Sequence, residues 1–189
     1  MIQQVKCASY WLVAMVLVTI CTGCGKASKC ALFGYNVGDK LTEEHQKAAR
    51  EGSLDFQFVG NDLLSGNWDV SIKVDSNYSV TDIQGRQRYQ GGGAEEKFNA
   101  VKKYLVSQFG EPIRGVLTDH YGKPLPLAQG DFMKLELWLV NEGKNYVGLN
   151  GKIRAKPDSV SKIYIMSGNL TDEAKENLKK MFGGDVFMK

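Results

Sequence analysis

Asp119 and His120 are the side chains of this sequence best suited to acid–base chemistry. A carboxylate can orient an imidazole, which then takes a proton from a nucleophile. The sequence holds only two histidines, and no Gly-x-Ser-x-Gly motif supplies a nucleophile. The other histidine, His45, lies on a polar predicted helix, where we expect it to be solvated. We therefore predict no catalytic residue, and a cell-wall or sugar hydrolase using Asp119 and His120 remains the alternative function.

Three consecutive glycines, at positions 91–93, precede a predicted helix and follow Arg86 and Arg88. Glycines at a helix N-terminus can bind an anion through backbone N–H groups. Here Glu95 and Glu96 occupy the first turn and would repel an anion, and the Lys-Ser/Thr pair of a phosphate-binding loop is missing. The glycines are better explained as a flexible connection.

The cysteines are few and gather near the N-terminus, at positions Cys7, Cys21, Cys24 and Cys30. Their spacing gives no ligand set for a metal, so no metal site and no cofactor is predicted. If Cys24 is modified, Cys30 is a free thiol or forms an intermolecular bridge. If Cys24 is unmodified, a disulfide between Cys24 and Cys30 can form in an oxidising compartment.

An apolar run from Trp11 to Ile20 follows a segment whose only charge is Lys6. This run is too short to span a bilayer as a helix, which needs about 20 apolar residues. Its length and its basic flank are typical of a signal peptide. Small residues then lead to Cys24, so we predict that residues 1–23 form an export signal.

Thr22-Gly23-Cys24 resembles the cleavage box of bacterial lipoproteins, although Cys21 stands where the family prefers leucine. The resemblance implies cleavage before Cys24, lipidation of that cysteine by diacylglycerol and an acyl chain such as palmitate, and anchoring in the cell envelope. Because Gly25 rather than aspartate follows, it further implies sorting to the outer membrane, facing the periplasm, in a Gram-negative host. A secretory signal with a chance cysteine and an uncleaved anchor are the alternatives.

The charge of the chain is close to balanced, with a formal net charge of +3. Proteins dedicated to nucleic acid normally carry a strongly basic stripe. We therefore expect no nucleic-acid partner. The partners that we expect are the membrane, through lipid on Cys24, and a protein or cell-envelope ligand.

Periodicity divides the body into strands and helices. Apolar residues alternate with polar ones in strands, as around Trp68 to Val74, and recur every three to four residues from Ala94 to Phe109, which predicts a helix. Further expected elements are a helix over 41–50, strands over 54–59, 78–83, 135–139, 146–155 and 160–166, and a helix after Thr171.

This order predicts an α+β fold, with an antiparallel sheet and helices packed on one of its faces. Both halves run strand, strand, strand, helix, which suggests two β-β-β-α units. We divide the chain into a signal peptide (1–23), a lipidated tether (24–35), a first α+β half (36–121), a connecting loop (122–131) and a second half (132–189). The halves together can form one domain.

Trp138 is the candidate for contact with a partner. It falls out of phase with Leu135, Leu137 and Leu139, so it points to the opposite face of its strand. Trp68, Trp138 and Tyr146 could form a binding platform if they share an outer face, or Trp138 could be buried beneath a helix. The leading hypothesis is an anchored, non-enzymatic envelope lipoprotein of the assembly, inhibitor or immunity type.

Overall fold

The computed structural model describes residues 31–61, 64–90, 92–119, 121, 123–125, 130–156, 158–183 and 187. The predicted signal peptide, Cys24 and Cys30 lie outside these residues. The elements are α1 (Glu43–Ala48), β1 (Ser53–Gly60), β2 (Gly66–Val74), β3 (Val80–Gln90), α2 (Ala94–Phe109), β4 (Arg114–Thr118), β5 (Phe132–Val140), β6 (Asn145–Ile153), β7 (Val160–Asn169) and α3 (Asp172–Phe182).

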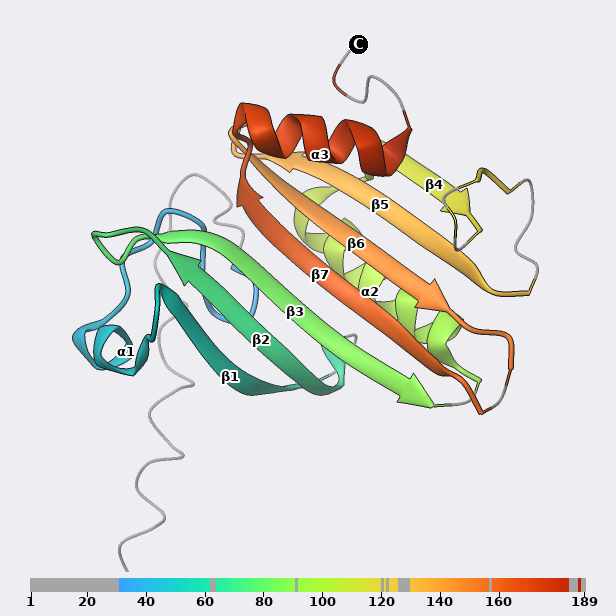
Figure 1. Ribbon diagram of the computed structural model, residues 1–189, viewed down its shortest axis with the longest axis horizontal. Coiled ribbons are helices and arrows are strands. Elements are labelled where there is room, and N and C mark those ends of the chain that lie inside the picture. The colour runs from blue at the N-terminus through green and yellow to red at the C-terminus, as the bar shows by residue number, and fades with distance from the viewer. Residues whose placement is uncertain are drawn as a thin grey trace, which may run out of the picture.

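One antiparallel sheet runs through the whole body, in the strand order β1-β2-β3-β7-β6-β5-β4 (Figure 1). The two predicted halves meet at its centre, where β3 pairs with β7 from Asp82–Gly168 to Gln90–Val160. The α+β class and the antiparallel sheet are therefore confirmed. Strand β4 was not predicted. It lies before the proposed connecting loop but pairs with β5, at the edge of the second half.

Helix α2 matches its predicted bounds. Its buried residues, Ala94, Phe98, Val101 and Leu105, form the apolar stripe expected from the sequence. The ring of Phe98 lies over Gly151 of β6, where an added Cβ would come within 2.4 Å of it. Gly110 ends the helix, and its N–H donates to the carbonyl of Val106.

Helix α3 packs on the face of the sheet opposite to α2 (Figure 1). Its Leu178 and Phe182 contact Leu135 and Leu137 of β5, whereas Trp138 belongs to the core beneath α2. Successive strand residues point to opposite faces, so the nearly continuous apolar run of β5 is buried on both. This placement corrects the expectation that the helices pack on one face. In chain order β1-β2-β3-α2 and β5-β6-β7-α3 each run β-β-β-α, with α1 before the first unit and β4 between the two, but their helices cover different faces.

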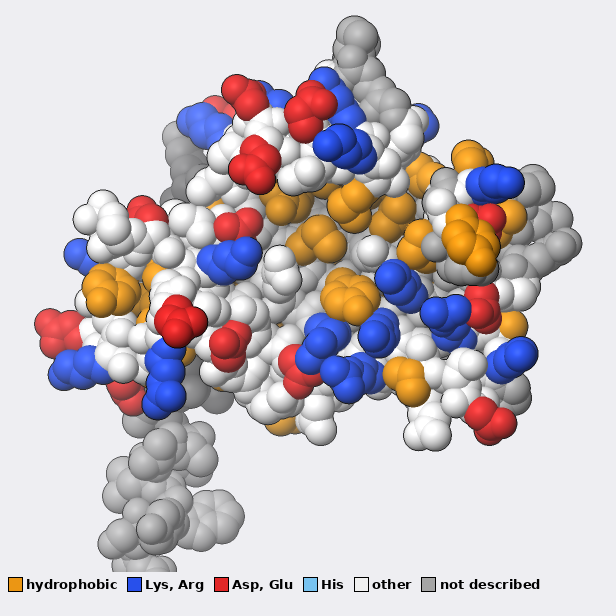
Figure 2. Space-filling model, viewed as in Figure 1, with side chains coloured by type: hydrophobic (Ala, Val, Ile, Leu, Met, Phe, Trp, Pro, Cys, Tyr) orange, Lys and Arg blue, Asp and Glu red, His pale blue; other side chains and the backbone are white. Residues whose placement is uncertain are grey.

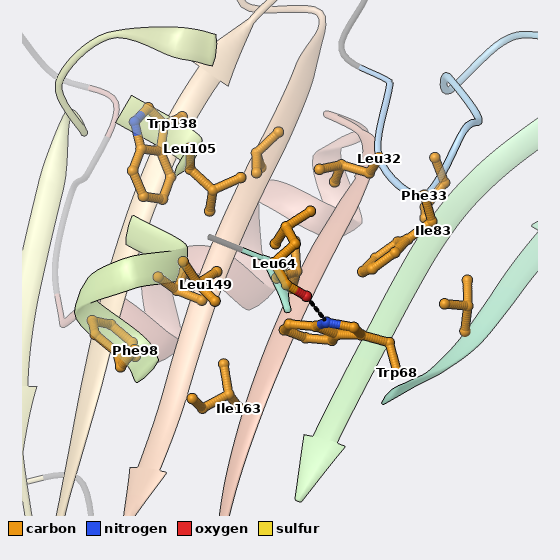
Figure 3. Packing of buried hydrophobic residues seen from close by; sticks show 14 of the residues in the cluster. Leu32, Phe33, Leu64, Trp68, Ile83, Phe98, Leu105, Trp138, Leu149 and Ile163 are labelled. Carbon is orange, nitrogen blue, oxygen red and sulfur yellow. Dashed lines mark hydrogen bonds between the residues drawn. The ribbon is translucent and has the colours of Figure 1, made fainter. Parts of the chain in front are cut away.

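The main core lies between α2 and the sheet, and Trp68 is at its centre (Figure 3). Its indole N–H donates to the carbonyl of Leu64 at 2.8 Å. The ring of Phe33 packs against Trp68 with centroids 5.5 Å apart. Leu32 and Phe33 are both buried here, so the last residues of the predicted tether (24–35) belong to the folded body and are fixed to the α2 side of the sheet.

Candidate ligand-binding face

Of the residues singled out in the sequence, those that the structure describes are not brought together as a site. Cys24 and His120 lie outside the described residues. Trp138 is 1% exposed, and its indole N–H donates to the carbonyl of Gly110 at 2.8 Å. Trp138 is therefore buried in the core beneath α2. The prediction that it contacts a partner is wrong, because its ring is not accessible. Trp68 and Trp138 point to the α2 side and Tyr146 to the other, so these rings form no platform.

Asp119 has a structural role in its own turn. Its Oδ1 accepts the backbone N–H groups of Tyr121 at 2.8 Å and of Lys123 at 2.9 Å. This is the local bonding that makes aspartate common in turns. In the described part of the chain, no three His, Cys, Asp or Glu side chains gather as a metal site.

His45 differs from its expected solvated state. Its Nδ1 lies 3.0 Å from the hydroxyl of Tyr35, and the two rings pack at 5.7 Å. Burial raises the pKa of the Tyr35 hydroxyl. This contact joins α1 to the segment before it, which gives His45 a structural role.

The glycines before α2 fit a connection rather than an anion site. Gly93 adopts a left-handed conformation with φ of 91° as the N-cap of α2, while Gly91 lies outside the described residues. Glu95 in the first turn forms an ion pair with Lys134 of β5. The start of the helix therefore presents a carboxylate that holds it to the sheet.

A large part of the sheet face on the α3 side is not covered by any of the described helices. Helix α3 lies over the β4–β5–β6 side, and charged and polar side chains with a few hydrophobic ones among them occupy the rest of the face (Figure 2). A groove of about 560 Å³ crosses β1, β2, β3 and β7. We call this the polar groove. Its side chains on the uncovered face are those of Asp55, Gln57, Asp69, Ser71, Gln84, Arg86 and Tyr164.

Asp69 is the centre of a bonded network in the polar groove. Arg86 donates to its Oδ2 from Nη2 at 2.9 Å and from Nε at 3.2 Å, and the amide of Gln57 donates to its Oδ1. Hydrogen bonds from Gln57 and then from Arg86 hold the pKa of Asp69 below its usual range, with a smaller contribution from the charge of Arg88. The network fixes the orientation of three polar side chains on neighbouring strands.

Three cations form a row beside the polar groove. Arg88 of β3 is directly opposite Lys162 of β7, and Lys162 is directly opposite Lys152 of β6. We call these three residues the basic row. Like charges directly opposite each other destabilise a sheet. Within the described residues none of the three forms an ion pair with a carboxylate. Figure 2 shows the resulting concentration of Lys and Arg over this part of the face.

Sequence reasoning named Arg88 only as a neighbour of the glycines and did not single out Lys152, Lys162 or Tyr164. The alternation Ser161-Lys162-Ile163-Tyr164-Ile165 does place Lys162 and Tyr164 together on the polar face of one strand. What it cannot give is the register that sets Lys162 between Arg88 and Lys152.

No family model matches the chain, and no match was found among curated proteins or solved structures. None of the described helices is long and apolar enough to cross a membrane.

Proposed function

We propose that this chain is a lipid-anchored protein of the bacterial cell envelope whose body is a binding module without enzymatic activity. The observation that carries the binding role is the uncovered face, where the polar groove and the basic row remain open to solvent. A row of like charges that forms no ion pair within the described residues weakens the sheet, so its presence is best explained by an anionic partner. The cell-envelope location rests on the apolar N-terminal run and on Thr22-Gly23-Cys24.

The same resemblance supports sorting to the outer membrane, facing the periplasm, in a Gram-negative host. Two or more acyl chains hold a protein firmly on a bilayer, whereas one chain binds reversibly. The hydrolase alternative gains no support from the described residues, since the carboxylate of Asp119 bonds to its own turn.

Replacing Cys24 with alanine should release the body from the membrane without unfolding it. The variant removes the thiol that would carry the diacylglycerol, and nothing else in the body changes. Fractionation of cells expressing the parent, Cys24→Ala and Cys30→Ala measures this. We expect Cys24→Ala alone to move to the soluble fraction, with an unfolding midpoint equal to that of Cys30→Ala. Membrane retention of Cys24→Ala at the level of the parent would contradict the anchor.

The binding role is tested by photo-crosslinking in cells. A crosslinking residue at Gln84, which is exposed in the polar groove, should capture an envelope component. The matched control carries it at Lys103, which is exposed on α2 on the other side of the sheet. We expect adducts at position 84 and only background at 103, as judged by mass spectrometry. Equal adducts at both positions, or none above background at either, would contradict a binding role for this face.

A further inference from the structure

The basic row concentrates positive charge over a short distance. Neighbouring strands lie about 4.8 Å apart, so Arg88, Lys162 and Lys152 span about 10 Å across β3, β7 and β6. A carboxylate or phosphate group bound there would offset the repulsion within the two opposed pairs and accept charge-assisted hydrogen bonds from the three cations. The row is thus suited to one or two negative groups rather than to a long polyanion.

The polar groove continues from this row. Tyr164 lies two residues along β7 from Lys162, about 7 Å away, and its ring lines the groove. A tyrosine ring presents an apolar surface with a polar tip, which suits the C–H face of a sugar ring. Beyond it, Gln57, Gln84 and Asp55 offer amide donors and carbonyl or carboxylate acceptors. Sugar hydroxyls both donate and accept, so they match this mixed lining.

Other classes of anionic partner fit this surface less well. The closely spaced phosphates of a nucleic acid would meet Asp55 and Asp69 in the groove. The core of a protein interface is usually apolar and depleted of charge, whereas this face is charged at its centre. A flat membrane surface would meet α3, which stands in front of the sheet on this side (Figure 1).

We propose that the polar groove and the basic row together bind an anionic saccharide, meaning a sugar that carries carboxylate or phosphate. The inference rests on the proposed binding function and deepens it by naming the ligand class. Tyr164 and the groove side chains contact the sugar ring and its hydroxyls, and Arg88, Lys162 and Lys152 hold the negative group.

Calorimetric titration of the full chain in mild detergent tests this inference. The probes are trigalacturonate, its fully methyl-esterified form, mannose 6-phosphate and hexaglutamate. We expect trigalacturonate or mannose 6-phosphate to bind, and the one that binds identifies the negative group as carboxylate or phosphate. The neutral ester of trigalacturonate and the hexaglutamate peptide should both bind at least tenfold more weakly than the preferred sugar.

Matched variants assign the binding to the two parts of the site. Lys162→Gln and Tyr164→Ala should each weaken binding about tenfold, while Tyr164→Phe, which keeps the ring, and Lys103→Gln on α2 should retain it. Lys162→Gln should also keep or raise the unfolding midpoint, because it removes like-charge repulsion from the row. A loss of binding in Lys162→Gln would then reflect the lost cation and not a loss of folding.

Three results would overturn the inference: equal binding of the neutral ester, undiminished binding by Lys162→Gln, or equal binding of hexaglutamate. Binding of neither sugar would overturn it as well. In that case, crosslinked adducts at position 84 would still support the proposed binding function, so the two failures can be told apart.

Discussion

Replacing Trp68 with alanine is expected to lower the free energy of unfolding by about 4 kcal/mol. Trp68 is fully buried at the centre of the core, where it contacts Phe33 and donates a hydrogen bond to Leu64. Removing the indole leaves a large cavity and takes the donor from a buried carbonyl. Urea unfolding followed by circular dichroism measures the change.

Two further variants separate the contributions to this loss. Trp68→Phe keeps an aromatic ring but removes the N–H, and should cost less than the alanine variant. Val59→Ala on β1 is the control, since Val59 is 76% exposed and should change stability by less than about 0.5 kcal/mol. If Trp68→Ala proves no less stable than Val59→Ala, the position assigned to Trp68 in the core is wrong.

Gly85→Ala should destabilise the body by about 2 kcal/mol, because it overpacks the core. A Cβ on Gly85 would lie 2.2 Å from Cζ of Phe33. That ring cannot swing away freely, since Phe58 and Trp68 pack around it with centroids 5.3 and 5.5 Å away. Thermal and urea unfolding of the purified chain would measure the loss.

The control for this variant is Gly92→Ala, because an added Cβ there would meet no atom within 4 Å. We expect it to leave stability unchanged or slightly higher. Combining Gly85→Ala with Phe33→Leu should recover part of the loss, because the smaller side chain relieves the clash. Additive costs in the double variant would show that the two residues do not contact each other.

Local periodicity was sufficient to predict most elements of this fold. The stripe of Phe98, Val101 and Leu105 predicts α2 with its observed bounds, and the alternation around Trp68 predicts β2. The side of the sheet that a helix covers is a long-range property. Leu137 and Trp138 of β5 indicate that both faces of this strand are buried. They do not indicate which helix covers which face of the sheet.

Strand β4 was not predicted because it, too, depends on a long-range contact. Its five residues, Arg114–Thr118, show no clear alternation of burial, with only Thr118 buried. They become a strand because β5 offers a pairing edge, a contact that lies far along the chain. A short segment whose strand state depends on a distant partner gives little signal in its own residues.

The candidate site was harder to foresee than the fold. Reasoning from motifs led to Asp119 and Trp138, both of which bond to nearby backbone groups. The basic row arises only when three strands from different parts of the chain take up a common register. Register depends on how the whole sheet assembles, so a scan of adjacent residues cannot show it.

The burial of Leu32 and Phe33 has a consequence for how the body would sit on its lipid. Leu32 lies eight positions after Cys24, with seven residues between them, and a fully extended chain of eight Cα–Cα steps reaches about 28 Å. If Cys24 carries the lipid, as proposed, this short segment keeps the body close to the surface of the bilayer. Phe33 fixes the end of this segment beside Gly85, on the α2 side of the sheet. The face that carries the polar groove and the basic row lies on the side of the sheet opposite to this attachment. It can therefore face away from the membrane, towards the envelope components beyond it.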